Sequence, residues 1–209
     1  MELENIPEVT PLCFFDAKIA IPQKKKGKFN SSHLLPNYED LNDSEHFAEV
    51  YMAWDEEGLD FQFVVNQPFQ MATYPDYQRK DCIELFIHTR SESMSRYFNK
   101  FSHHFLFFPV KVSGIHGMEI TKFRGEDQHE LCLPERLKVE ADLEKKRYLV
   151  NVTLSKNELY GFDPQIAQEI RVNYRIHRYQ NEPQIFFLGT LDQKDHHLSL
   201  WPKIQLIKS

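Results

Sequence analysis

The clearest pattern in the chain is an alternation of apolar and polar positions between residues 47 and 66. Residues 50–54 place three apolar side chains on one face at a period of two, which is the period of a half-buried β-strand. Residues 55–58, Asp-Glu-Glu-Gly, then have turn chemistry, and the glycine is free to adopt a positive φ. A second alternating run at 59–65 follows, so we predict a β-hairpin and a third antiparallel strand at residues 81–88.

The predicted strands need a second layer, because each presents an apolar face that a single sheet would leave in water. Other runs predict further strands at residues 9–22, 103–112 with an interruption at Pro109, 115–124, 137–143, 148–154, 172–177, 185–188 and 204–207. One short helical turn is expected, with Ser155 as its N-cap and Glu158 at the capping-box position. We therefore predict an all-β fold, a two-layer antiparallel β-sandwich of the immunoglobulin-like or jelly-roll type.

A chain of 209 residues is long enough for one such sandwich. Residues 1–44 are expected to be an N-terminal extension of the same domain, with the strand at 9–22 on a sheet edge and a polar surface loop after it. Residues 45–209 are expected to form the sandwich itself.

The composition agrees with an all-β fold, since the chain contains 17 Phe and 9 Tyr, residue types that favour strands. The formal net charge of -6 argues against a nucleic-acid partner, for which a basic domain is expected. The basic run at residues 24–28 is expected to be a solvated loop rather than a patch for phosphate or a membrane surface.

Cysteine usage and the start of the chain bear on location. Three cysteines cannot all pair, and Cys13, Cys82 and Cys132 lie in apolar segments, so free buried thiols are expected. The N-terminal segment is acidic and broken by prolines, unlike a secretion signal, and no apolar run is long enough to span a membrane. These features predict a cytoplasmic location.

The predicted hairpin and third strand also resemble a known family. The segments "AWDEEGLDFQFVV" and "DCIELFIHT", separated by a loop with Pro75 and Tyr77, resemble the core of family 9 carbohydrate-binding modules and their DOMON-like relatives. The later segments "KKRYLVNVTLSKNELYGFDP" and "IRVNYRIHR" are similar to a hairpin, a connection and a strand of that family. The resemblance covers residues 45–207 and implies a non-catalytic binding module for a saccharide or a similar small polar ligand. It also implies an extracellular location, in conflict with the missing signal.

The resemblance further implies a site. Sugars present C–H faces and hydroxyl rims, so their sites combine aromatic platforms with a few charged or amide groups. Tyr77 matches the stacking aromatic before the third strand, and Glu84 matches the acidic position within it. The implied ligand-binding residues are Tyr74, Tyr77, Glu84, Asn173, Arg175 and His177. The alternative is that Glu84 and Arg175 form a structural ion pair.

Two departures from the family weaken the sugar interpretation. The second aromatic of the family falls at Thr190 or Leu191 here, and a family arginine is replaced by Leu106. Each stacking contact is worth about 0.5–1.5 kcal/mol beyond its buried area, so one lost wall removes much of the affinity. The first alternative is therefore an interaction or structural protein that keeps the fold without a sugar site. Trp54 is expected in the core, and Trp201 either packs at the end of the sandwich or serves as an exposed platform.

Histidines suggest a second alternative, a metal-dependent enzyme built on histidine loops. Adjacent histidines in a strand point to opposite faces of the sheet. Only one histidine of the pair His103-His104, and only one of the pair His196-His197, can therefore reach a shared site. A zinc or iron site is conceivable from His104, His197 and a carboxylate.

The favoured prediction is no enzyme and no cofactor. A structural Ca²⁺ remains an alternative because hard cations take oxygen ligands from loops, here Asp76, Asp81, Asp192 and Asp195. A glycosidase would pair Glu84 with Glu119 or Asp142, but no motif in the sequence demands it. The expected partner is a saccharide or small polar ligand, with a protein partner also open.

Overall fold

The structure is a computed structural model that describes residues 18–24, 29–37, 45–90, 98–123, 125–186, 198 and 201–208. Its strands are β1 (Lys18–Pro22), β2 (Ala48–Asp55), β3 (Gly58–Val65), β4 (Cys82–His88), β5 (Ser102–Val112), β6 (Ile115–Glu119), β7 (Lys138–Leu143), β8 (Tyr148–Ser155), β9 (Glu169–Arg178), β10 (Asn181–Ile185) and β11 (Lys203–Ile207). Among the described residues there are also three single 3-10 turns, η2 (Ser31–His33), η3 (Pro134–Arg136) and η4 (Lys156–Glu158). No helix of the described residues is long and apolar enough to cross a membrane.

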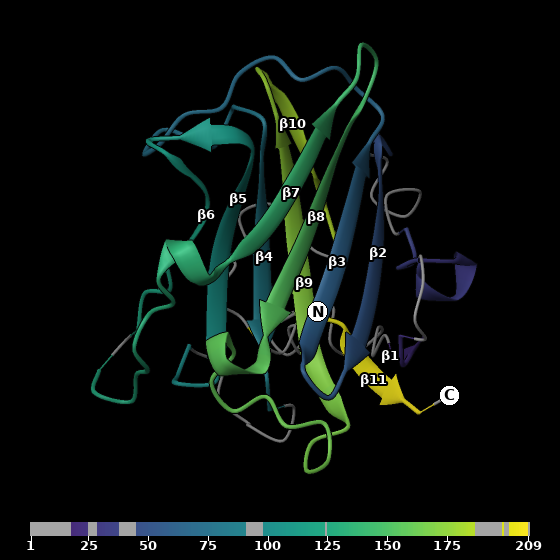
Figure 1. Ribbon diagram of the computed structural model, residues 1–209, viewed down its shortest axis with the longest axis vertical. Coiled ribbons are helices and arrows are strands. Elements are labelled where there is room, and N and C mark those ends of the chain that lie inside the picture. Colours follow the sequence, from purple (N-terminus) through teal and green to yellow (C-terminus); the bar gives the residue numbers. More distant parts are fainter. Residues whose placement is uncertain are drawn as a thin grey trace, which may run out of the picture.

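The strands form two sheets that pack face to face (Figure 1). One sheet has the order β2-β3-β8-β7, and the other has the order β1-β11-β9-β4-β5-β6 with β10 also paired to β9. The predicted all-β, two-layer sandwich is thus confirmed. Every pair of described strands is antiparallel except β1 with β11, which is parallel. This pairing places Lys18–Pro22, the described part of the strand predicted at 9–22, on a sheet edge as predicted.

The third predicted strand does not extend the hairpin. The hairpin β2–β3 lies in the four-stranded sheet, whereas β4 lies between β5 and β9 in the opposite sheet. All seven residues of β4 are buried, because one face packs on the core and the other is covered by side chains from β5, from β9 and from the segment around Trp201. The strand predicted at residues 81–88 is thus present as β4, and the alternation did not indicate which of the two sheets it joins.

The core fills the space between the sheets with large side chains from both. Phe61 and Phe63 stack at 6.1 Å between ring centroids, and Tyr174 of the opposite sheet meets Phe63 edge-on. Trp54 is 1% exposed, as expected of a core residue, and its indole N–H donates to the Ile21 carbonyl at 2.9 Å. That bond links β1 to the hairpin and satisfies the one polar group of a buried tryptophan.

The β2–β3 turn is as tight as the sequence predicts. The Asp55 side chain accepts hydrogen bonds from the backbone N–H groups of Glu57 and Gly58 at 2.7 and 3.1 Å. A Cβ at Gly58 would lie 2.0 Å from the Leu154 carbonyl oxygen of β8. Glycine is required there by the close approach of the neighbouring backbone.

Several predicted strand boundaries shift. Pro109 does not interrupt β5, because a register shift between Phe107 and Val112 accommodates it. β6 ends at Glu119, before the predicted end at residue 124. β10 spans Asn181–Ile185 and so begins before the predicted strand at 185–188, whose last two residues lie outside the described part of the chain.

Of the predicted capping box, the Ser155 N-cap bond forms, whereas Glu158 accepts a hydrogen bond from another part of the chain. Ser155 caps η4 by accepting from the Asn157 N–H at 3.3 Å. Glu158 instead accepts from the Cys132 thiol at 3.0 Å, so its carboxylate is engaged elsewhere. Cys82 and Cys132 are free and buried, as predicted, while Cys13 lies outside the described residues.

Candidate functional site

The predicted polar residues gather on the outer face of the seven-stranded sheet. Glu84 of β4 lies directly opposite Leu106 of β5 on one side and Arg175 of β9 on the other. Directly paired residues share a face, and that face is opposite to the one carrying the core residues of β4. His177 of β9 shares the face, two positions along from Arg175.

Four side chains converge on the Glu84 carboxylate. His104 Nε2 donates to Oε2 at 2.8 Å, and His177 Nε2 donates to Oε1 at 2.5 Å. Arg175 Nη1 donates to Oε1 at 3.3 Å, and the Tyr77 hydroxyl lies 3.4 Å from Oε2. Glu84 is itself 1% exposed, so this carboxylate is enclosed by protein donors.

The cluster fixes the charge of Glu84. Burial alone would raise the pKa of this carboxyl group, but the hydrogen bonds from His104 and His177 outweigh it and hold the pKa well below its usual range. Burial also raises the pKa of Tyr77, with the Glu84 charge adding to the effect. Glu84 is therefore ionised and Tyr77 neutral at physiological pH.

Two tyrosines stand beside this cluster. The rings of Tyr74 and Tyr77 are nearly parallel, with 6.5 Å between centroids and 7° between planes. Tyr77 meets the His177 ring edge-on at 5.9 Å, while Tyr74 is 43% exposed. The two residues give an aromatic surface that runs from the Glu84 cluster out to solvent.

A groove of about 320 Å³ borders the cluster. Its lining residues are Gln78, Arg79, Arg175, His177, Asn181, Glu182 and Pro183. Arg175 and His177 thus face Glu84 on one side and line the groove on the other. The volume is at the lower end of the range for small-molecule sites, and the lining is rich in groups that bond hydroxyls.

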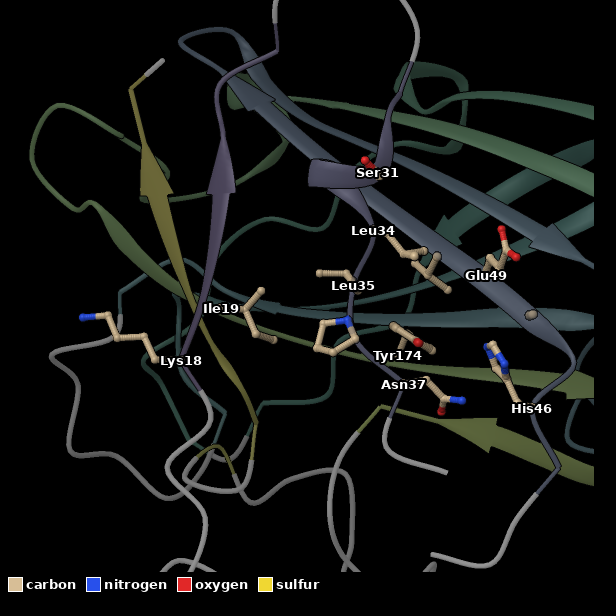
Figure 2. Close-up of a pocket in the computed structure, with 12 residues that line it drawn as sticks. Lys18, Ile19, Ser31, Leu34, Leu35, Asn37, His46, Glu49 and Tyr174 are labelled. Atoms are coloured by element: carbon tan, nitrogen blue, oxygen red, sulfur yellow. The ribbon is translucent and has the colours of Figure 1, made fainter. Parts of the chain in front are cut away.

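A larger hollow of about 520 Å³ lies near the strand edges at β1 and β2 (Figure 2). Ile19, Leu35 and Val50 are among its apolar lining residues, and Tyr174 of the core also borders it. Lys18, His46 and Glu49 contribute charge or polarity, but no described contact joins them into a cluster like that at Glu84.

Comparisons with known proteins support the fold. No protein-family model matches the sequence, and no curated protein matches it. The structure is similar to a carbohydrate-binding module of family 9 from Caldicellulosiruptor kristjanssonii in complex with cellotriose, with a TM-score of 0.62, 13% identity, and coverage of 92% of this chain and 94% of that chain. The same organism's module in complex with glucose gives a TM-score of 0.63 at 12% identity, covering 92% and 96%. A carbohydrate-binding protein from Bacteroides uniformis, whose function is itself only inferred, gives a TM-score of 0.54 at 8% identity, covering 91% and 99%.

This chain has the fold of a family 9 carbohydrate-binding module. The fold resemblance predicted from the sequence is confirmed over nearly the whole chain, and the DOMON-like part of it stays a prediction.

Within this module-like fold, Asn173 does not join the Glu84 cluster. It lies on the same face of β9, opposite Phe86 of β4, and is 2% exposed. Its side-chain oxygen has no hydrogen-bond partner among the described residues. Tyr77, Glu84, Arg175 and His177 are brought together as the resemblance implies, with Tyr74 stacked beside them.

Leu106 fills the place of the family arginine with apolar packing. It is fully buried against Cys82 and Phe108, and Tyr77 packs on the same cluster. The position corresponding to the family's second aromatic, Thr190 or Leu191, lies outside the described residues. Trp201 is 3% exposed and packs on Phe86 and Phe98, so it is a packing residue rather than an exposed platform.

His104 is a member of the Glu84 cluster that was not among the residues predicted from the sequence. The sequence offered it only as one ligand of an alternative metal site with His197; in the structure it bonds Glu84 and stacks on Phe86 with 4.1 Å between ring centroids. The alternation of β5 contained the signal, since His104 and Leu106 share one face. His197 lies outside the described residues.

The carboxylates proposed for other chemistry have different surroundings. Asp81 accepts backbone N–H bonds from Gln70, Met71 and Tyr179 at 2.8, 2.8 and 3.3 Å, so it ties loops together. Asp192 and Asp195 lie outside the described residues, and the calcium alternative stays untested.

The glycosidase pair does not assemble. Glu119 is paired with Phe105 and faces the core side of the sheet, opposite to Glu84. Asp142 lies on β7 of the other sheet and is exposed.

Proposed function

We propose that this chain is a non-catalytic binding module for a saccharide or a similar small polar ligand, held at the groove beside Arg175 and His177. The observation that carries the proposal is that both residues line the groove while Glu84 fixes their orientation from behind. Similarity to structures that contain cellotriose or glucose supports the ligand class.

Each group has a chemical task in this proposal. Arg175 donates to ligand hydroxyls in the groove, and the Nδ1 lone pair of neutral His177, whose Nε2 hydrogen bonds Glu84, accepts from one. Tyr74, outside the groove lining, offers an exposed ring for the C–H face of a sugar. Glu84 is a positioning residue, because its oxygens already accept four contacts and only 1% of it is exposed. This differs from the direct hydroxyl contact implied by the family resemblance.

The test is calorimetric titration with glucose, xylose, cellobiose and cellotriose. Wild type is expected to show saturable binding, and Tyr74→Ala and Tyr77→Ala are each expected to weaken it by about 2–12-fold, the equivalent of one stacking contact. Tyr51→Ala on the outer side of the four-stranded sheet is the matched control and should bind like wild type. Equal affinities in all three variants would contradict the site.

A second candidate is an interaction or structural protein that keeps the fold without a sugar site. It is favoured by the enclosed Glu84 carboxylate and by the apolar packing of Leu106. Absence of binding to every sugar by a chain with wild-type unfolding behaviour would favour this candidate over the first.

A further inference from the structure

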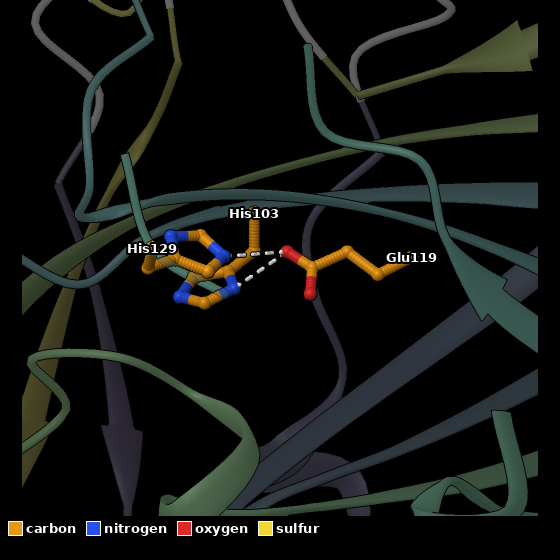
Figure 3. A group of neighbouring side chains, drawn as sticks. All are labelled: His103, Glu119 and His129. Carbon is orange, nitrogen blue, oxygen red and sulfur yellow. Dashed lines mark hydrogen bonds and ion pairs between the residues drawn. The ribbon is translucent and has the colours of Figure 1, made fainter. Parts of the chain in front are cut away.

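A second group of titratable side chains lies apart from the groove, on the core side of the same sheet. His103 comes from β5, Glu119 from β6 and His129 from the loop after β6 (Figure 3). The side chains of His103 and Glu119 are fully buried, and that of His129 is 3% exposed. Three segments therefore deliver two imidazoles and one carboxylate to one enclosed point.

The contacts converge on a single oxygen. His103 Nδ1 and His129 Nε2 each lie 2.9 Å from Glu119 Oε1, and one ligand atom from each residue falls within 4.8 Å of the others. The Thr121 hydroxyl donates to the same oxygen at 2.7 Å, and the Cys132 N–H donates to Oε2 at 2.7 Å. Glu119 is thus already held in place by two donors, apart from its contacts with the histidines.

The far nitrogens of both rings face acceptors. His129 Nδ1 lies 2.8 Å from the Lys100 carbonyl oxygen, and His103 Nε2 lies 3.5 Å from the Tyr160 carbonyl oxygen. A carbonyl oxygen can only accept, so the 2.8 Å contact places a hydrogen on His129 Nδ1, and the longer 3.5 Å contact favours a hydrogen on His103 Nε2. In the neutral rings the near nitrogens then present lone pairs to a carboxylate oxygen, which is also an acceptor.

Two arrangements resolve this clash of acceptors while both carbonyl contacts are kept. In one, both rings gain a proton and become imidazolium ions, which places two like charges 4.3 Å apart between ring centroids in a buried site. In the other, one cation takes the place of both protons and binds all three acceptor atoms. The second arrangement uses the tautomers that the carbonyl groups already select, which is the usual outer-shell pattern for metal-bound histidine.

We propose that His103, Glu119 and His129 form a binding site for one divalent transition-metal cation, with Zn²⁺ the best match. Two imidazole nitrogens and one carboxylate oxygen suit Zn²⁺, with bonds of about 2.0–2.2 Å. Tetrahedral bonds of that length separate neighbouring ligand atoms by about 3.4 Å, so the 2.9 Å contacts would open by about half an ångström. Such a shift lies within side-chain adjustment.

The site would have a structural effect. It would tie the loop that carries His129 to β5 and β6, where the ring of His129 also packs between Phe123 and Tyr160. Because only the folded chain assembles the three ligands, bound metal favours folding. The proposal is independent of the saccharide groove, whose residues lie on the other face of the sheet.

The experiment uses the full chain, freed of metal with a chelator and then titrated with Zn²⁺, Co²⁺, Ca²⁺ and Mg²⁺. One equivalent of Zn²⁺ is expected to bind, and Zn²⁺ at about 100 times its dissociation constant is expected to raise the melting temperature by about 5–10 °C. Ca²⁺ and Mg²⁺ should not substitute, since both prefer oxygen ligands. No stoichiometric Zn²⁺ binding by wild type would overturn the proposal.

A matched pair of variants locates the ion. His129→Gln is expected to abolish the stoichiometric binding, whereas His116→Gln is expected to retain it, because His116 lies on β6 but bonds the Phe108 carbonyl outside the cluster. Zn²⁺ bound equally by His129→Gln would place the ion elsewhere and refute the assignment. Should His129→Gln fail to fold, the Co²⁺ form of wild type decides. Visible ligand-field bands of a nitrogen- and oxygen-ligated ion, without a thiolate charge-transfer band, support the site, and their absence refutes it.

Discussion

Replacing Glu84 by glutamine tests whether the outer cluster is as closed in solution as the structure describes. Glu84→Gln removes the charge that three hydrogen-bonded partners share, namely His104, His177 and Arg175. The Arg175 side chain is 12% exposed, so its charge would lose its buried partner without gaining much water. The NH2 group of the new glutamine amide also faces one of the groups that donate to Glu84 in the wild type, so two hydrogen-bond donors oppose each other.

The magnitude follows from that geometry. Breaking a buried ion pair by removing one partner costs about 3–5 kcal/mol, and the three contacts are too close together to add independently. Urea unfolding of Glu84→Gln should therefore show a free energy of unfolding about 3–5 kcal/mol below wild type. Glu45→Gln is the control, since Glu45 pairs with Arg178 while its side chain is 62% exposed, and it should change stability by less than about 1 kcal/mol. A loss in Glu84→Gln no larger than in the control would refute the closed cluster and leave Glu84 free to bond a ligand directly.

Three further predictions concern stability. Burial, followed by the nearby charge of Arg171, lowers the pKa of His88 from 6.5 to about 4. Between these two pH values the unfolded chain binds a proton at this histidine that the folded chain does not. The free energy of unfolding should therefore fall by about 3 kcal/mol on this account as the pH drops from 6.5 to 4. Urea unfolding across that range should show a shallower decline in His88→Gln, and an unchanged slope would count against the assignment. Gly58→Ala should lower the free energy of unfolding by about 2–4 kcal/mol, because its Cβ would meet the Leu154 carbonyl at 2.0 Å, and a smaller loss in urea would mean that the turn relaxes easily. Trp54→Phe should cost about 1–3 kcal/mol by leaving the Ile21 carbonyl without its donor, and should speed amide hydrogen exchange in β1; exchange as slow as in wild type would show that β1 is held by other contacts.

The sequence predicts the layers well because strand alternation is a local property. The hairpin β7–β8 has the predicted pairing, with Leu143 opposite Tyr148 across the charged turn. What alternation does not contain is the identity of the sheet that each strand joins. Glu84 and Phe86 make one face of β4 look half polar, yet both are buried, because His104, Arg175 and Trp201 from distant segments cover them.

The residues of the two sites also differ in whether the sequence could predict them. Glu84, Arg175 and His177 could be grouped from the family resemblance, since each lies on a strand and its face follows from its position. His129 could not, because it lies in an irregular loop where no period relates it to His103 or Glu119. Only the three-dimensional path of that loop brings its ring onto the sheet.

The adjacent histidines of β5 connect both proposals and explain why they are separable. His104 and His103 point to opposite faces of one sheet, and each meets a buried glutamate from a neighbouring strand, Glu84 on β4 and Glu119 on β6. Glu84 also has Arg175, a permanent cation, so its negative charge is balanced within the protein. Among the described residues Glu119 has no arginine or lysine partner, and its two histidines offer lone pairs once the carbonyl groups have fixed their hydrogens. The outer glutamate is thus complete without a ligand and serves to orient the groove, whereas the inner one still needs positive charge, which is why a cation is proposed there and a sugar at the groove.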